Sequence, residues 1–144
     1  MYLIDTNVIS EARKGRRAHA GVRRFFEDVA RDNVDVFLSV VTMGELRRGI
    51  ELVRYRGDER QARRLERWFA SILDRYSDFV LGIDAEIAQI WGRLWVPHPH
   101  NALGKQIAAT ALIHDLTVVT RNDRHFVQTG VRVVNPFGTE PPGP

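Results

Sequence analysis

With 144 residues the chain has the length of one domain, and its 44% hydrophobic content excludes wholesale disorder. It contains no cysteine, which excludes disulfides, thiolate catalysis and cysteine-ligated zinc and fits a reducing cytosol. The formal net charge is +3 and arginine far outnumbers lysine, which favours phosphate contacts, although interleaved acids also fit a solvated helix face. We read no signal peptide and no membrane span, and therefore expect a cytoplasmic protein without a membrane partner.

The first half of the chain alternates apolar runs with helical patterns. Residues 2–4 form a short apolar run that predicts a buried strand, and the β-branched run at 34–40 predicts a second one. Apolar spacing predicts helices at 6–14, 18–32, 42–56 and 58–75. The last two form a predicted helical hairpin that carries much of the arginine.

The second half continues the alternation. Strands are predicted at 79–83, 116–120 and 131–134, and helices at 85–96 and 103–114. We interpret the His-x-His pair in the proline-containing loop 97–101 as a surface turn rather than a metal site. The whole pattern predicts an α/β fold with a mostly parallel central sheet of about four to five strands flanked by helices. We expect one domain at 1–137 and a flexible Pro/Gly-rich tail at 138–144.

Polar side chains fall where three of the expected strands end. Asp5 ends the first strand, Glu45 lies one turn into the helix after the second, and Asn122 and Asp123 follow the fourth. The carboxyl ends of parallel strands meet at one edge of a sheet, so these groups can converge. Their hard oxygens suit Mg²⁺ or Mn²⁺, and such an ion supports phosphodiester cleavage.

Each of these residues also has a purely structural interpretation. Asp5 or Thr6 is a suitable cap for the next helix. Thr42 and Glu45 match a capping box, and Asn122-Asp123 is a common turn sequence. Their joint placement at one sheet edge is what favours a functional site.

Four stretches, in order, carry a more specific pattern: Leu3-Ile4-Asp5-Thr6-Asn7-Val8, then residues 39–46, 107–112 and 116–122 with Phe126. Together they resemble the PIN-domain ribonucleases, specifically the VapC-type toxins of bacterial toxin–antitoxin pairs. The resemblance spans almost the whole chain and implies a three-layer PIN-like fold. It also implies that Mg²⁺ (or Mn²⁺) activates a water to attack an RNA phosphodiester, that the protein forms a homodimer, and that a cognate antitoxin protein neutralises it.

Carried over position by position, the resemblance makes Asp5 and Glu45 metal-binding acids and puts Asn122 at the fourth polar position of the family. For the antitoxin, we expect a segment laid into a groove between helical layers, with a basic side chain over the acids. The assigned sets are Asp5, Glu45 and Asn122 for catalysis, Asp5, Glu45 and Asp123 for metal, and Thr6, Asn7 and Arg121 for substrate.

One departure from the family pattern stands at residue 104. The family has an aspartate three residues before the Ile-Ala-Ala-Thr stretch, where this chain has Gly104 followed by Lys105. Loss of one acid weakens a hard-cation site, and loss of one well-placed catalytic group costs about 10²–10³ in rate. The chain is then an engineered inactive variant, a natural member with a degraded site, or a protein in which Asp123 replaces the ligand. His125 also stands where an acid is common.

Two functions from different classes follow. The first is an Mg²⁺-dependent endoribonuclease toxin whose arginine-rich hairpin holds the RNA backbone. The second is a PIN-fold binding module that keeps its antitoxin and dimer contacts but cleaves little. Gly104 is the residue that distinguishes these two functions, since Gly104→Asp should restore metal affinity if the chain is a disabled enzyme. A phosphoacceptor receiver domain is a weaker third reading, because it needs a later strand that ends at lysine, and this one ends at Thr120-Arg121.

Overall fold

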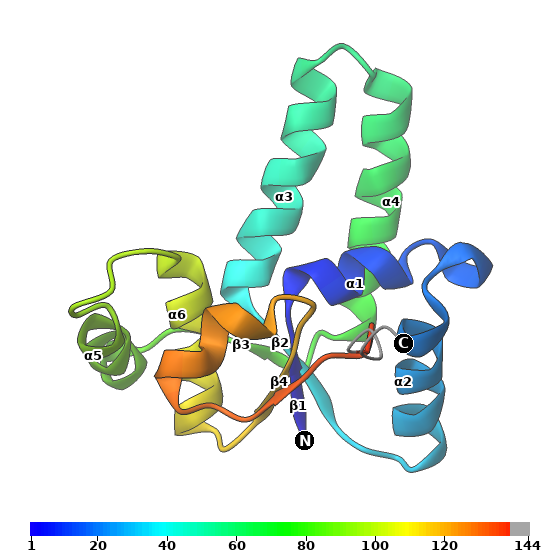
Figure 1. Ribbon diagram of the computed structural model, residues 1–144. Coiled ribbons are helices and arrows are strands. Elements are labelled where there is room, and N and C mark those ends of the chain that lie inside the picture. The colour runs from blue at the N-terminus through cyan, green and yellow to red at the C-terminus, as the bar shows by residue number, and fades with distance from the viewer. Residues whose placement is uncertain (139–144) are drawn as a thin grey trace, which may run out of the picture.

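The computed structural model describes residues 1–138 and contains a five-stranded, fully parallel sheet in the order β3-β2-β1-β4-β5 (Figure 1). This confirms the predicted α/β class and the parallel sheet. Registers pair Leu3 with Phe37 and with Val118. The strands are shorter than predicted: β1 Tyr2–Ile4, β2 Val36–Ser39, β3 Val80–Leu81, β4 Thr117–Val119 and β5 Val133–Val134.

Helices cover both faces of the sheet. Their bounds are α1 Thr6–Ala12, α2 Ala20–Arg31, α3 Val40–Tyr55, α4 Glu59–Arg75, α5 Ala85–Leu94 and α6 Ala102–Ile113, with 3-10 turns η1 Gly15–Arg17 and η2 Asp123–Thr129. In Figure 1, α1 and α2 lie on one side of the sheet and α5 and α6 on the other. Among residues 1–138, none of the helices has both the length and the apolar character needed to cross a membrane.

Successive side chains of a strand point to opposite faces of the sheet, so the molecule has one hydrophobic core on each face. Ile4 and Val119 face the α1–α4 side, where they pack with residues such as Val8 and Leu46. Their neighbours Leu3 and Val118 face the α5–α6 side and pack against Ile107, Ala108, Ala111 and Phe126. A sheet buried on both faces is the three-layer arrangement expected from the sequence.

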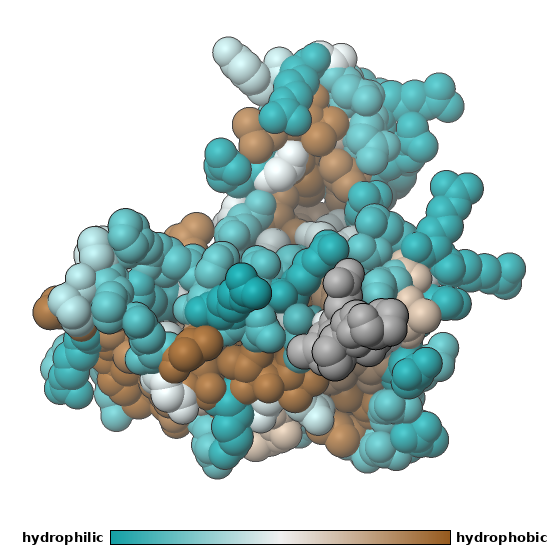
Figure 2. Space-filling view, in the orientation of Figure 1, coloured by the Kyte–Doolittle hydropathy of each residue, from teal (hydrophilic) through white to brown (hydrophobic). Residues whose placement is uncertain are grey.

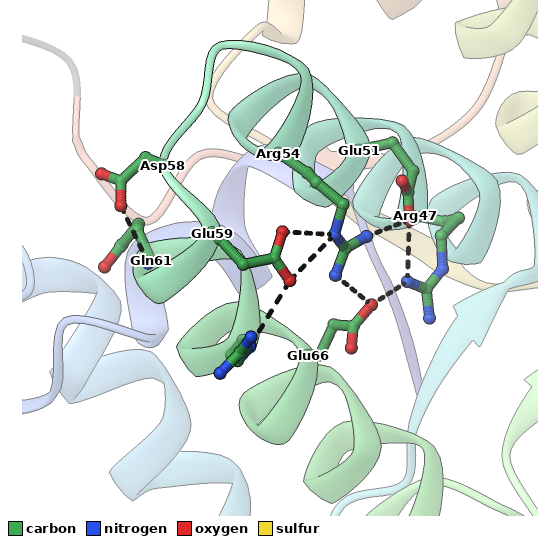
Figure 3. Close-up of polar contacts among 8 residues, drawn as sticks. Arg47, Glu51, Arg54, Asp58, Glu59, Gln61 and Glu66 are labelled. Atoms are coloured by element: carbon green, nitrogen blue, oxygen red, sulfur yellow. Dashed lines mark hydrogen bonds and ion pairs between the residues drawn. The ribbon is translucent and has the colours of Figure 1, made fainter.

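The predicted helical hairpin is present as α3 and α4, which project from the body of the molecule (Figure 1). Gly57 makes the turn at φ +94°, a left-handed conformation that suits glycine, and the Asp58 side chain accepts a hydrogen bond from the Gln61 N–H at 3.0 Å. Ion pairs then join the two helices (Figure 3). Arg54 of α3 lies 2.7 Å from Glu66 of α4, and it also pairs within α3 with Glu51 at 2.7 Å.

Three details differ from the sequence prediction. Helix α3 begins at Val40, directly after β2, and Ser39 caps it by accepting from the Val41 N–H at 3.0 Å. Thr42 is therefore inside the helix and does not start a capping box. The apolar spacing of the predicted helices at 85–96 and 103–114 turns Trp95 and Leu112 toward the core, but these side chains are 40% and 37% exposed. The expected tail at 138–144 lies, apart from Gly138, outside the described residues.

Candidate active site

A cavity opens at the carboxyl edge of the central strands. Its volume is about 490 Å³, and it is bounded by the ends of β1 and β4, the base of α3 and the first turn of α6. The lining residues are Asp5, Thr6, Asn7, Glu45, Asn101, Ala102, Leu103, Gly104, Ile107, Asn122, His125 and Phe126. Five of the seven residues assigned from the sequence thus lie in one cavity: Asp5, Thr6, Asn7, Glu45 and Asn122.

Asp5 is 9% exposed and its carboxylate is held on several sides. One oxygen accepts from the Thr6 backbone N–H at 2.8 Å, so Asp5 caps α1. The other accepts from the Thr120 hydroxyl at 2.8 Å and from the Asn7 amide at 3.3 Å. Asp5 is therefore both a helix cap and a cavity residue, and its orientation is fixed by the fold itself.

Glu45 reaches across to α1 rather than back along its own helix. The Thr6 hydroxyl lies 2.9 Å from Glu45 Oε1 and 3.1 Å from the hydroxyl of Thr42, which is fully buried. Partial burial raises the pKa of the Glu45 carboxyl, the negative charge of Asp5 adds to this, and the hydrogen bond from Thr6 opposes it. The two acids are thus electrostatically coupled, and the capping-box interpretation of Glu45 is wrong.

Asn7 ties the ends of β1 and β4 together. Its side-chain oxygen accepts from the Arg121 N–H at 3.0 Å, while its amide nitrogen donates to Asp5 and, at 3.4 Å, to the hydroxyl of Thr120. The fully buried Thr120 hydroxyl also accepts from the Asn122 N–H at 3.0 Å. This network orders the cavity wall that carries Asn122.

Asp123 and Arg121 are not brought to the cavity. Asp123 Oδ1 accepts from the N–H of Arg124 at 2.9 Å within its own turn, and the Arg121 guanidinium lies 4.6 Å from the centre of the Phe137 ring. Nowhere in residues 1–138 do three Asp, Glu, His or Cys side chains gather as a metal site. The expected metal set of Asp5, Glu45 and Asp123 is therefore not assembled, and neither the third acid nor a substitute carboxylate is present in the cavity.

A model of the PIN-domain family matches residues 2–131. This chain belongs to the PIN-domain family. Toxin FitB of Neisseria gonorrhoeae is 34% identical over 142 residues, covering 95% of this chain and 99% of that protein. The VapC ribonuclease Y4jK of Sinorhizobium fredii is 28% identical, covering 95% and 98%. The crystal structure of FitAcB from Neisseria gonorrhoeae superimposes with a TM-score of 0.82 at 33% identity, covering 96% of this chain and 100% of that chain.

The PIN-domain membership confirms the resemblance to VapC-type toxins read from the sequence. Two polar side chains of the cavity, those of Asn101 and His125, were not assigned a role from the sequence. Asn101 precedes α6 and its side chain accepts from the Gly104 N–H at 3.2 Å, so it is the helix cap. An Asn just before a helical run is a recognisable cap signal, but its place in this PIN-domain cavity depends on the fold.

The oxygen donors of the cavity fit a divalent cation of the Mg²⁺ type. Mg²⁺ is commonly bound through one or two carboxylates, with waters and substrate phosphates completing its shell. Asp5 and Glu45 supply two carboxylates from different elements, and Asn101 and Asn122 line the same cavity with neutral amides. Such a donor set predicts a weaker protein-only site than three acids do, because affinity follows the number of charged ligands.

Proposed function

We propose that this chain is the toxin of a toxin–antitoxin pair and that it hydrolyses RNA phosphodiester bonds with the help of Mg²⁺ or Mn²⁺. The observation that carries the proposal is the convergence of Asp5 and Glu45 in one open cavity at the sheet edge of a PIN fold. The names of the relatives, a toxin and a VapC ribonuclease, support the same activity.

The chain's own residues prepare the cavity for this reaction. Thr6 and Thr120 hold Asp5 in place, and the Thr6 hydroxyl holds Glu45. Asp5 and Glu45 would hold a divalent cation, which would supply a water of lowered pKa and a contact for a phosphate oxygen. Positive charge near Glu45 favours its ionised form, which offsets the effect of burial on its pKa. Asn122, on the same wall, is placed to orient a phosphate oxygen or a water.

The arginines of the hairpin divide into two groups. Arg47 and Arg54 contact Glu51, Glu59 and Glu66 and so hold the hairpin together (Figure 3). Arg60, Arg64 and Arg67 are exposed along one face of α4 and form no ion pair within the described part of the chain. In Figure 2, hydrophilic side chains cover the outer side of α4, and apolar side chains lie between the two helices of the hairpin. We name these three residues the arginine ridge and propose that it contacts RNA phosphates.

A second depression fits the antitoxin. It lies among α1, α2 and α4 and has a volume of about 290 Å³. Its apolar lining includes Val22, Phe26 and Trp68, and its charged lining has a net positive charge from Arg13, Arg23 and Arg75 against Glu27. A peptide with apolar anchors and acidic flanks would complement this surface. We propose this groove as the antitoxin site. A homodimer remains a proposal from the family resemblance, tested by light scattering after gel filtration.

Gly104 supports a second candidate function, a PIN-fold binding module with little or no cleavage. Within residues 1–138, only Asp5 and Glu45 provide carboxylates to the cavity, so cation binding is the weakest step of the proposed enzyme. A binding module would keep the antitoxin groove and the dimer and lose the metal chemistry.

Titration of Mn²⁺ followed by RNA cleavage with Mg²⁺ or EDTA distinguishes the two functions. Glu45→Gln is the test variant, and Glu86→Gln, an exposed acid in the first turn of α5, is its control. The enzyme predicts saturable Mn²⁺ binding and Mg²⁺-dependent cleavage that Glu45→Gln abolishes and Glu86→Gln retains. If the unmodified chain shows neither Mn²⁺ binding nor RNA cleavage but still binds the antitoxin, the enzyme is excluded and the binding module is supported.

A further inference from the structure

The α6 wall of the cavity carries a single polar side chain. Of its five lining residues, Ala102, Leu103, Gly104 and Ile107 offer none, and Asn101 is the exception. We propose that Asn101 is the third polar ligand of the site, and that a carboxylate at position 101 would complete it while residue 104 stays glycine. This inference rests on the proposed cation-dependent function.

The backbone holds Asn101 firmly at this position. It adopts the left-handed conformation, with φ 56° and ψ 55°, which Asn tolerates better than most residues. Its carbonyl accepts from the Lys105 N–H at 3.1 Å, and its side-chain oxygen accepts from the Gly104 N–H at 3.2 Å. The buried Lys105 ammonium donates to the carbonyl of His100, which fixes the preceding residue as well. The amide of Asn101 is therefore ordered on the cavity wall by the cap of α6.

The same side chain fills the space that any side chain at residue 104 would need. A Cβ added to Gly104 would lie 2.1 Å from Asn101 Nδ2, 2.7 Å from its Cγ and 2.8 Å from its Oδ1. These distances are far inside van der Waals contact, so a side chain at 104 requires the end of the Asn101 side chain to move. A carboxylate at 104 requires the Asn101 side chain to leave its cap. This qualifies the sequence-based expectation that Gly104→Asp by itself restores a metal site.

An amide here has different chemistry from a carboxylate. The side-chain oxygen of Asn101 has a second lone pair that can coordinate a cation or its water, but it brings no negative charge. No hydrogen bond of Asn101 Nδ2 is found in residues 1–138, so this donor is available to an anionic phosphate oxygen. The cavity therefore depends more on the phosphate of its substrate for cation binding than a cavity with three acids does.

Substitution by aspartate at 101 tests this assignment directly. Asn101→Asp keeps the shape, the cap oxygen and the tolerated backbone conformation, and adds one negative charge to the cavity. We expect Mn²⁺ binding, measured by isothermal titration, to tighten by about tenfold or more, since affinity follows the charge of the ligands. Asn33→Asp is the matched control, because Asn33 also has positive φ (52°) but lies on an exposed turn after α2.

Variants at 104 test whether a side chain there displaces Asn101. Gly104→Asp alone should bind Mn²⁺ less tightly than Asn101→Asp and should melt at a lower temperature than the unmodified chain, because it displaces the Asn101 cap of α6. Asn101→Gly combined with Gly104→Asp frees the space, and this pair should bind more tightly than Gly104→Asp alone. Thermal melting of every variant shows that the folded protein is being titrated.

The outcomes separate this inference from the proposed function. If the unmodified chain binds Mn²⁺ through Glu45 but Asn101→Asp leaves the affinity unchanged, the assignment of Asn101 is overturned and the proposed function stands. Gly104→Asp that binds as tightly as Asn101→Asp would also overturn it. If neither the unmodified chain nor Asn101→Asp binds Mn²⁺, both the inference and the cation-dependent function fail.

Discussion

Asp5→Asn should destabilise the fold, whereas Glu45→Gln should not, although each removes one negative charge from the cavity. If the new Asn oxygen keeps the Thr6 N–H, its amide nitrogen faces the Thr120 hydroxyl and the Asn7 amide, both of which donate to Asp5. The Thr120 hydroxyl cannot become an acceptor for the new amide, because it already accepts hydrogen bonds from Asn122 and Asn7. One buried donor loses its acceptor, which costs about 1–3 kcal/mol.

This loss is measurable by urea unfolding in EDTA, followed by tryptophan fluorescence. For a chain of this size it corresponds to a fall in Tm of about 3–10 °C. Glu86→Gln serves again as the control for loss of one surface charge. An Asp5→Asn variant with the unfolding midpoint of the unmodified chain would refute the reasoning that the Asp5 network is structural.

Glu45→Gln should raise the Tm at pH 7, because burial raises the pKa of Glu45 and so disfavours its ionised form in the folded state. The gain should shrink as the pH falls through the raised pKa of Glu45, and it should vanish below the ordinary value of 4.5, where the carboxyl is protonated in both states. A gain that grows at low pH would contradict this. Ser39→Ala should lower stability by about 1 kcal/mol in urea unfolding, since Ser39 caps α3. Phe126→Ala should cost about 3–5 kcal/mol in the same assay, because Phe126 is 1% exposed in the α6-side core. Replacing the arginine ridge by Gln should reduce the salt slope of RNA binding by about 2, since each phosphate contact on a single strand contributes about 0.7.

The sequence predicted the parallel sheet and the hairpin because these depend on local patterns. Apolar runs such as residues 2–4 followed by polar residues mark strand ends, and Gly57 with Asp58 marks a helical turn. The start of α3 was missed for a physical reason. Thr42 and Glu45 match a capping box, but β2 passes directly into the helix and Ser39 supplies the cap three residues earlier.

The sequence predicted the cavity residues whose position depends only on where a strand ends. It did not predict those whose place in the cavity depends on the direction of the side chain. Asp5 and Glu45 were predicted from the places where the first two strands end. Asn122 and Asp123 are adjacent in a 3-10 turn, and only Asn122 lines the cavity while Asp123 bonds within the turn. Asn101 was not assigned, because its place on the cavity wall depends on the packing of α6 against distant elements.

The two acids of the cavity carry different information about function. Asp5 caps α1 and accepts from Thr120 and Asn7, so selection for stability alone would retain it. Glu45 has a raised pKa and a single acceptor contact with Thr6, so the fold on balance disfavours its ionised form. Its presence is therefore better explained by a positively charged ligand than by folding. Mn²⁺ titration of Glu45→Gln is accordingly a more direct test of cation binding than substitution of Asp5, whose loss would change the fold and the site together.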